Sequence, residues 1–172
     1  KILVFNKLIF LMNINIEAES GFIKYYDIDY NLENSWLSGF IDGYGGFYIR
    51  YTKGKVSQNR KERIGCRMTL YQRVSLKCGT SYDKIMGCIK EKLNCKLYKI
   101  EKNSRFYYII SCSSMLEVTN LVEYLDSYEL KSSKYLDYVD FKEVHLMLKS
   151  KIAYENVTLV KLYKLRMNNS RN

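Results

Sequence analysis

The stretch Trp36-Leu37-Ser38-Gly39-Phe40-Ile41-Asp42-Gly43-Tyr44-Gly45-Gly46-Phe47 decides the fold of this chain. Its larger apolar residues recur every three to four positions, which places them on one face of a helix and is also the pattern of an ordinary buried helix. Gly39 and Gly43 lie four residues apart, so they form a strip without side chains where a matching helix can pack closely. Gly45 and Gly46 follow, and we expect them to end the helix in the left-handed conformation that glycine adopts without strain.

The run from Leu37 to Gly45 resembles the signature of the LAGLIDADG homing endonucleases and of the intron maturases related to them. Trp36 before the run and Phe47 after it are also similar to that family. In the family, the second acid of the motif holds the metal ions that cleave DNA, and here this position is Tyr44. Asp42 matches the first acid, for which the resemblance implies a structural role in the helix. The resemblance therefore implies the family's fold, and it leaves the cleavage reaction open.

The chemistry of Tyr44 predicts a catalytically degenerate site. A phenol with a pKa near 10 is neutral at pH 7, and Mg²⁺ prefers carboxylate and carbonyl oxygens. We expect no cofactor and no DNA cleavage by a symmetric pair of these chains, with Tyr44 packing on the helix and contacting nucleic acid. Magnesium would be needed only if the chain works with a partner half that has an intact acid. The family also places a lysine beside the scissile phosphate, and Lys131 and Lys134 are the two candidates here.

The order of the expected elements extends the resemblance from about Trp36 to about Leu148. The helix is followed by two alternating strands, a helix from about Ser81 to Leu93, a hairpin with an Asn103-Ser104 turn, and further helices. We predict an α+β fold, a LAGLIDADG-like αββαββα saddle with an antiparallel sheet and extra C-terminal helices. We divide the chain into an N-terminal arm or linker (1–32), this domain (33–150), and a C-terminal helix with a basic tail (151–172).

Most of the positive charge lies between Arg50 and Lys77. This segment holds nine basic residues and one acid, Glu62, so it contributes +9 − 1 = +8 of the net charge of +10. The return strand of the first hairpin alternates, with Cys66, Met68 and Leu70 on one side and polar residues, Thr69 among them, on the other. The basic residues therefore project from one face of a ribbon, although a charge run is also typical of a solvated surface.

Aromatic rings on that face can stack on bases, which favours a nucleic-acid partner. A two-stranded ribbon fits the major groove of B-form DNA, whereas on RNA it would contact phosphates, 2′-hydroxyls and splayed bases. The predicted nucleic-acid-binding residues are Tyr48, Arg50, Lys53, Lys55, Arg60, Lys61, Arg63, Arg67, Tyr71, Arg73, Lys77, Lys131 and Lys134.

Two functions fit these patterns. The first is a degenerate LAGLIDADG-fold protein that binds structured RNA, an organellar ribosomal RNA or a group I intron, beside other ribonucleoprotein subunits. The alternative is a homing endonuclease subunit that cuts double-stranded DNA with a second LAGLIDADG-like half. No membrane role is expected, because the basic residues alternate along strands rather than along an amphipathic helix. The abundance of Lys, Asn, Ile and Tyr, which have AT-rich codons, points to an organelle gene and a mitochondrial protein.

Overall fold

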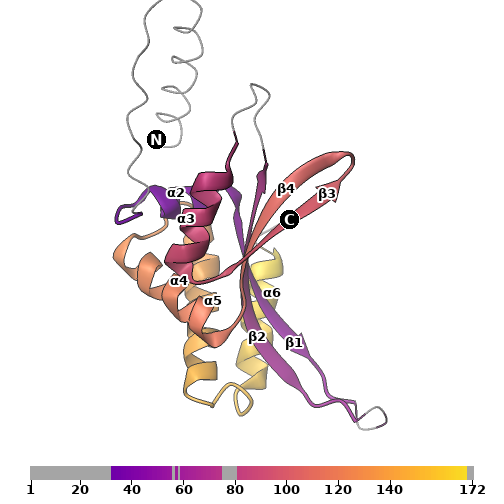
Figure 1. Ribbon diagram of the computed structural model, residues 1–172. Helices are drawn as coiled ribbons and strands as arrows, with labels where there is room; N and C mark the ends of the chain where they lie inside the picture. Colours follow the sequence, from indigo (N-terminus) through magenta and orange to yellow (C-terminus); the bar gives the residue numbers. More distant parts are fainter. Residues whose placement is uncertain (1–31, 56, 58, 75–80, 170–172) are drawn as a thin grey trace, which may run out of the picture.

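The computed structural model describes residues 32–55, 57, 59–74 and 81–169 (Figure 1). Residues 1–31 of the predicted N-terminal arm (1–32), Lys77, Cys78 and residues 170–172 lie outside the described residues. The predicted αββαββα order is confirmed, and two helices follow it. The elements are α2 (Trp36–Tyr44), β1 (Gly45–Thr52), β2 (Arg63–Arg73), α3 (Asp83–Leu93), β3 (Lys96–Lys102), β4 (Arg105–Cys112), α4 (Met115–Ser127), α5 (Lys134–Lys149) and α6 (Val157–Asn169).

Helix α2 passes directly into strand β1. Its Leu37 and Ile41 side chains are buried in the core, and the Asn34 side chain accepts a hydrogen bond from the Trp36 amide at 2.8 Å. The expectation that Gly45 adopts a left-handed conformation was wrong, because its φ of −80° and ψ of 158° are those of extended backbone. Glycine is needed there for space instead, since a Cβ on Gly45 would lie 2.7 Å from the Ile41 carbonyl oxygen.

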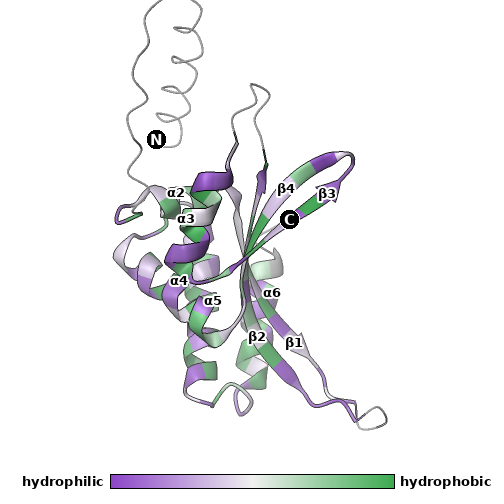
Figure 2. Cartoon of the chain, in the orientation of Figure 1, coloured by the Kyte–Doolittle hydropathy of each residue, from purple (hydrophilic) through white to green (hydrophobic). Residues whose placement is uncertain are grey.

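The four strands form one antiparallel sheet in the order β1-β2-β4-β3. The β3–β4 hairpin closes through Asn103 and Ser104, which both have positive φ, as a two-residue type I′ turn requires. Figure 1 shows the two hairpins diverging from the place where the strands cross, with β3–β4 running to the upper right and β1–β2 to the lower right. Along both hairpins hydrophilic and hydrophobic residues alternate, as Figure 2 shows. The sheet is therefore a twisted saddle with two arms.

The helices cover one face of this sheet. Phe47 of β1 packs against Phe141 and Tyr138 of α5, with ring centroids 5.2 and 5.8 Å apart. Helix α6 packs against β1 and α5 and contributes Val160 and Met167 to the same hydrophobic core. Within the part of the chain described here, no helix has the length and apolar character that a membrane span needs. Among the described residues, no helix packs on the opposite face of the sheet (Figure 1).

Candidate nucleic-acid interface

The register of β1 and β2 determines which side chains point away from the helices. Phe47 and Ile49 are buried toward the helices, so Tyr48 and Arg50 point to the other side, which we call the outward face. Directly paired residues share a face, which places Arg67 opposite Tyr48. Arg50, Arg63, Tyr71 and Arg73 are exposed on this face, Tyr48 is partly exposed, and Arg67 is half-buried.

The outward face continues onto β3 and β4, where no binding residue is predicted from the sequence. Ser111 pairs with Lys96, Ile109 with Tyr98, and the hairpin ends at the pair of Lys102 and Arg105. These residues belong to the outward face because Ser111 and Ile109 pair with Thr69 and Tyr71 on β2. The period-two spacing of Lys96, Tyr98, Ile100 and Lys102 is the signal that could have found them.

Across all four strands, the outward face is basic and aromatic. The strand positions on this side include no acidic residue within the described chain. A surface of this kind attracts phosphates and offers rings on which bases can stack. The basic residues on it are Arg50, Arg63, Arg67, Arg73, Lys96, Lys102 and Arg105, and the tyrosines are Tyr48, Tyr71, Tyr98 and Tyr107.

The loop between β1 and β2 extends this charge beyond the sheet. Lys55 and Arg60 pair with each other through two backbone hydrogen bonds of 2.9 and 3.0 Å, so the base of the loop is ordered. Lys53 and Lys61 flank this pair, and all four of these side chains are exposed. The predicted basic residues of the first hairpin thus lie together along one arm of the saddle.

Asp42, near the end of α2, is engaged in structural hydrogen bonds. One carboxylate oxygen accepts from the backbone N–H of Lys131 at 2.7 Å, and the other accepts from the Ser132 hydroxyl at 2.6 Å. These contacts fasten the end of α2 to the segment that leads into α5. The Lys131 side chain itself is exposed and pairs with Glu129 at 3.1 Å, so it does not reach α2.

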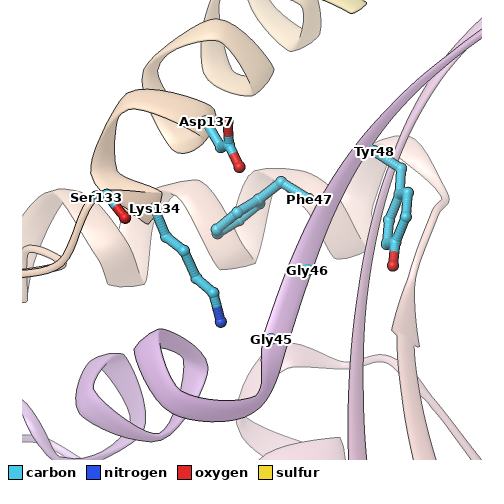
Figure 3. A pocket seen from close by; sticks show the side chains of 7 residues that line it. All are labelled: Gly45, Gly46, Phe47, Tyr48, Ser133, Lys134 and Asp137. Carbon is cyan, nitrogen blue, oxygen red and sulfur yellow. The ribbon is translucent and has the colours of Figure 1, made fainter. Parts of the chain in front are cut away.

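Lys134 is the lysine that the structure brings to the end of α2. Its Nζ lies 3.4 Å from the carbonyl oxygen of Ile41. A pocket of about 360 Å³ lies beside it, between the Gly45–Tyr48 segment of β1 and the first turn of α5 (Figure 3). Figure 3 shows Lys134 reaching toward the junction of α2 and β1, while Phe47 and Tyr48 leave the strand on opposite sides.

Tyr44 completes a row of rings along α2. Its ring centroid lies 5.2 Å from that of Phe40, which in turn stacks on Trp36 at 5.0 Å. The Tyr44 side chain is nevertheless 50% exposed, so it packs on the helix and still faces outside. Sequence spacing placed it with the buried residues of α2, and the structure places it at the margin of that face.

The end of α2 does not fit a divalent metal ion held by this chain alone. The position that the family fills with a metal-binding acid carries the phenol of Tyr44, and both carboxylate oxygens of Asp42 are already hydrogen-bonded. The nearby Lys134 brings a positive charge to the same place. Among the described residues there is no cluster of three or more His, Cys, Asp or Glu side chains that could hold a metal.

The predicted helix interface consists of Gly39 and Gly43 on α2, and these two glycines differ in how far they are exposed to solvent. Gly43 is exposed and Gly39 is half-buried, so the glycine strip is open to a partner along part of its length. Ser38 on the same helix is buried, and its hydroxyl donates to the Ser35 carbonyl at 2.7 Å. The strip remains a predicted interface.

Comparison with known proteins identifies the family. The LAGLIDADG endonuclease family model matches residues 37–145, and this chain belongs to that family. The probable intron-encoded DNA endonuclease aI1 of Mycosarcoma maydis is 33% identical over 114 residues, which cover 64% of this chain and 94% of that protein. The intron-encoded DNA endonuclease aI3 of Saccharomyces cerevisiae is 27% identical over 131 residues, but the match covers only 32% of that longer protein.

Solved structures agree with the fold. The LAGLIDADG meganuclease I-AabMI, described as bound to uncleaved DNA, has a TM-score of 0.61 and 26% identity over 78% of this chain and 44% of that one. The homing endonuclease I-TnaI has a TM-score of 0.62 and 17% identity over 77% of this chain and 86% of that one. The chain thus corresponds to less than half of I-AabMI and to most of I-TnaI.

Proposed function

We propose that this chain is a DNA-binding half of an intron-encoded LAGLIDADG endonuclease, and that it contributes no metal-binding acid of its own. The observation that carries the proposal is the outward face, which is basic and aromatic on all four strands. A twisted ribbon of this kind fits the major groove of duplex DNA, where arginine can contact guanine. The description of the Mycosarcoma maydis and Saccharomyces cerevisiae relatives as DNA endonucleases supports the DNA alternative over the RNA-binding one.

A second half would pack on α2. The accessible glycine strip at Gly39 and Gly43 supports this, and so does the match to I-AabMI, which covers 44% of that chain. Cleavage would then depend on the partner, because Tyr44 supplies no carboxylate. The intron-encoded relatives, together with the abundance of amino acids that have AT-rich codons, support an origin in an organelle intron, and hence a mitochondrial protein.

Selection from random pools tests this proposal. The full chain is incubated with a pool of random duplex DNA and, separately, with a pool of random RNA hairpins. Both incubations are done in EDTA and then in Mg²⁺. We expect enrichment of a duplex DNA sequence in EDTA and no cleavage of it by this chain alone in Mg²⁺. Preferential enrichment of RNA would overturn the proposal that the ligand is DNA. Cleavage in Mg²⁺ would overturn the proposal that this chain contributes no metal-binding acid.

A further inference from the structure

Thr69 is a buried polar residue on the face of the sheet that should be exposed. It lies in the middle of β2, opposite Gly46 of β1 and Ser111 of β4, and so belongs to the outward face. Its side chain is nevertheless only 4% exposed, and its Oγ1 is buried without a hydrogen-bond partner. The sequence predicts the direction of this side chain correctly and does not predict its burial.

The residues around Thr69 form a row of small side chains across three strands of the sheet. Gly46, Thr69 and Ser111 are small and lie side by side on three neighbouring strands, and Lys96 ends the same row on β3. Tyr48 lies over the Gly46 end, since a Cβ on Gly46 would be 3.0 Å from the Tyr48 hydroxyl oxygen and 3.2 Å from its ring. The aromatic ring thus occupies the space that the missing side chain leaves.

Arg67 is the second residue with an unsatisfied donor at this place. It pairs directly with Tyr48 across β1 and β2 and lies two residues before Thr69 on the same face. Its Nε is buried and has no hydrogen-bond partner. Two hydrogen-bond donors, one neutral and one charged, are therefore unsatisfied beside the Tyr48 ring.

An unsatisfied buried hydroxyl lowers stability, and valine has nearly the shape of threonine without that cost. Such groups are rare in folded proteins, and a site that binds a ligand is one reason for them. Hydroxyl and guanidinium groups donate hydrogen bonds, and the oxygens of a phosphate accept them. Small residues in the row also let a ligand backbone approach the sheet closely.

We propose that Thr69 and Arg67 bind a backbone phosphate of duplex DNA, and that Tyr48 covers this position in the free protein. The inference rests on the proposed function and names one phosphate contact at the centre of the saddle. Rotation of the Tyr48 side chain to another rotamer uncovers the two donors, which is a fast and local movement. The Tyr48 ring is then available to contact the DNA.

The Thr69→Val variant of the full chain tests the phosphate contact, with duplex DNA from the selection above as the probe. We expect affinity to fall by about tenfold, the usual effect of losing one hydrogen bond to a charged group, while the melting temperature stays the same or rises. The matched control is Thr158→Val on α6, an exposed threonine on the helical side, which should bind as the wild type does. Equal affinity of Thr69→Val and wild type would overturn the inference, and so would a lower melting temperature, which would show that the folded protein satisfies the hydroxyl.

A Thr69→Cys variant tests whether the Tyr48 side chain covers position 69 in the free protein. Its thiol is alkylated with a small reagent, and the extent at position 69 is followed by peptide mass spectrometry. We expect slow labelling in the free protein and clearly faster labelling when Tyr48→Ala is added. Equal rates would overturn the covering role. If the wild type binds no duplex DNA, the proposed function fails and this inference fails with it; if the wild type binds and Thr69→Val binds equally, only this inference fails.

Discussion

The Asp42 carboxylate and the Ser132 hydroxyl join the first and the last parts of the family fold, at a distance of 2.6 Å. They are 90 residues apart in the sequence, and the same carboxylate also accepts a hydrogen bond from the Lys131 amide at 2.7 Å. The contact positions the start of α5, and therefore Lys134, beside the end of α2. Asp42, the first acid of the motif, is thus engaged in hydrogen bonds that join α2 to the start of α5. Tyr44 stands at the position of the second acid.

Asp42→Ala should remove both hydrogen bonds and leave two donors without their partner. We expect the free energy of unfolding to fall by about 1–2 kcal/mol, because Asp42 is only half-buried and water can replace part of the contact. Urea denaturation followed by circular dichroism measures the change. The control is Glu129→Ala, which removes the exposed pair with Lys131 and should cost almost nothing. A cost no larger than that of the control would refute the tethering role of Asp42.

Glu117 and Ser114 form a capping box at the start of α4. The Glu117 carboxylate accepts from the Ser113 and Ser114 amides at 2.7 and 2.9 Å, and the Ser114 hydroxyl accepts from the Glu117 amide at 3.3 Å. Burial acts to raise the pKa of Glu117, but these hydrogen bonds and the charge of Lys96 outweigh it, and the pKa is lowered. The charged form is therefore the one that the folded state favours.

Glu117→Ala should lower the free energy of unfolding by about 1 kcal/mol at pH 7. Because the folded pKa of Glu117 lies below its unfolded value of 4.5, this contribution is present above pH 4.5 and is lost as the pH falls further. The difference between variant and wild type should therefore shrink in acid. Thermal unfolding from pH 7 to pH 3 measures it, with Glu123→Ala on the exposed side of α4 as control. A difference that stays constant with pH would be inconsistent with the charged cap.

His145 is a buried histidine that is neutral at pH 7. Its Nε2 lies 3.0 Å from the Thr119 hydroxyl oxygen, and burial together with the charge of Lys149 lowers its pKa below 6.5. The unfolded chain takes up a proton at a higher pH than the folded chain does, so stability is lost as the pH falls below 6.5, by at most about 1.4 kcal/mol per pH unit. In the range just below pH 6.5, the wild type should lose stability faster than His145→Gln. If the stability of the wild type and of His145→Gln changed equally with pH, the lowered pKa of His145 would be contradicted.

Tyr44 is the residue that separates this half from a cleaving one. We expect Tyr44→Asp to nick the selected duplex in Mg²⁺, because a carboxylate then stands at the exposed end of α2, and we expect Tyr44→Asn to remain inactive. Gel electrophoresis of supercoiled plasmid carrying the site measures nicking. Inactivity of Tyr44→Asp with normal DNA affinity would show that more than one ligand is missing.

Much of the fold could be predicted from the sequence because its signals are local. Alternating residues gave the strands, Asn103-Ser104 gave the turn, and the motif gave the helix and its partner strand. The conformation of Gly45 could not be predicted, because the reason for that glycine is the Ile41 carbonyl oxygen beside it. The choice between Lys131 and Lys134 likewise depends on how α5 is placed against α2.

The candidate site was predicted for one arm of the saddle only. The first hairpin has a dense run of charge that is visible in composition, whereas the second hairpin mixes Lys96, Lys102 and Arg105 with one acid, Glu101, and with apolar residues. Only the pairing of β2 with β4 puts these residues on the same face as Arg67. The burial of Thr69 also depends on neighbours from other strands, which no period in β2 can reveal.

The salt dependence of duplex DNA binding by Arg63→Ala/Arg67→Ala tests the central claim most directly. The control variant, Lys149→Ala/Lys151→Ala, also removes two positive charges, but from the helical side of the protein. If the outward face binds DNA, the arginine variant binds more weakly, and the slope of log K against log salt concentration becomes flatter by about two, since each phosphate contact adds about 0.9. The lysine variant should keep the wild-type slope. Wild-type affinity and slope in the arginine variant would contradict the assignment of the sheet as the DNA-binding surface.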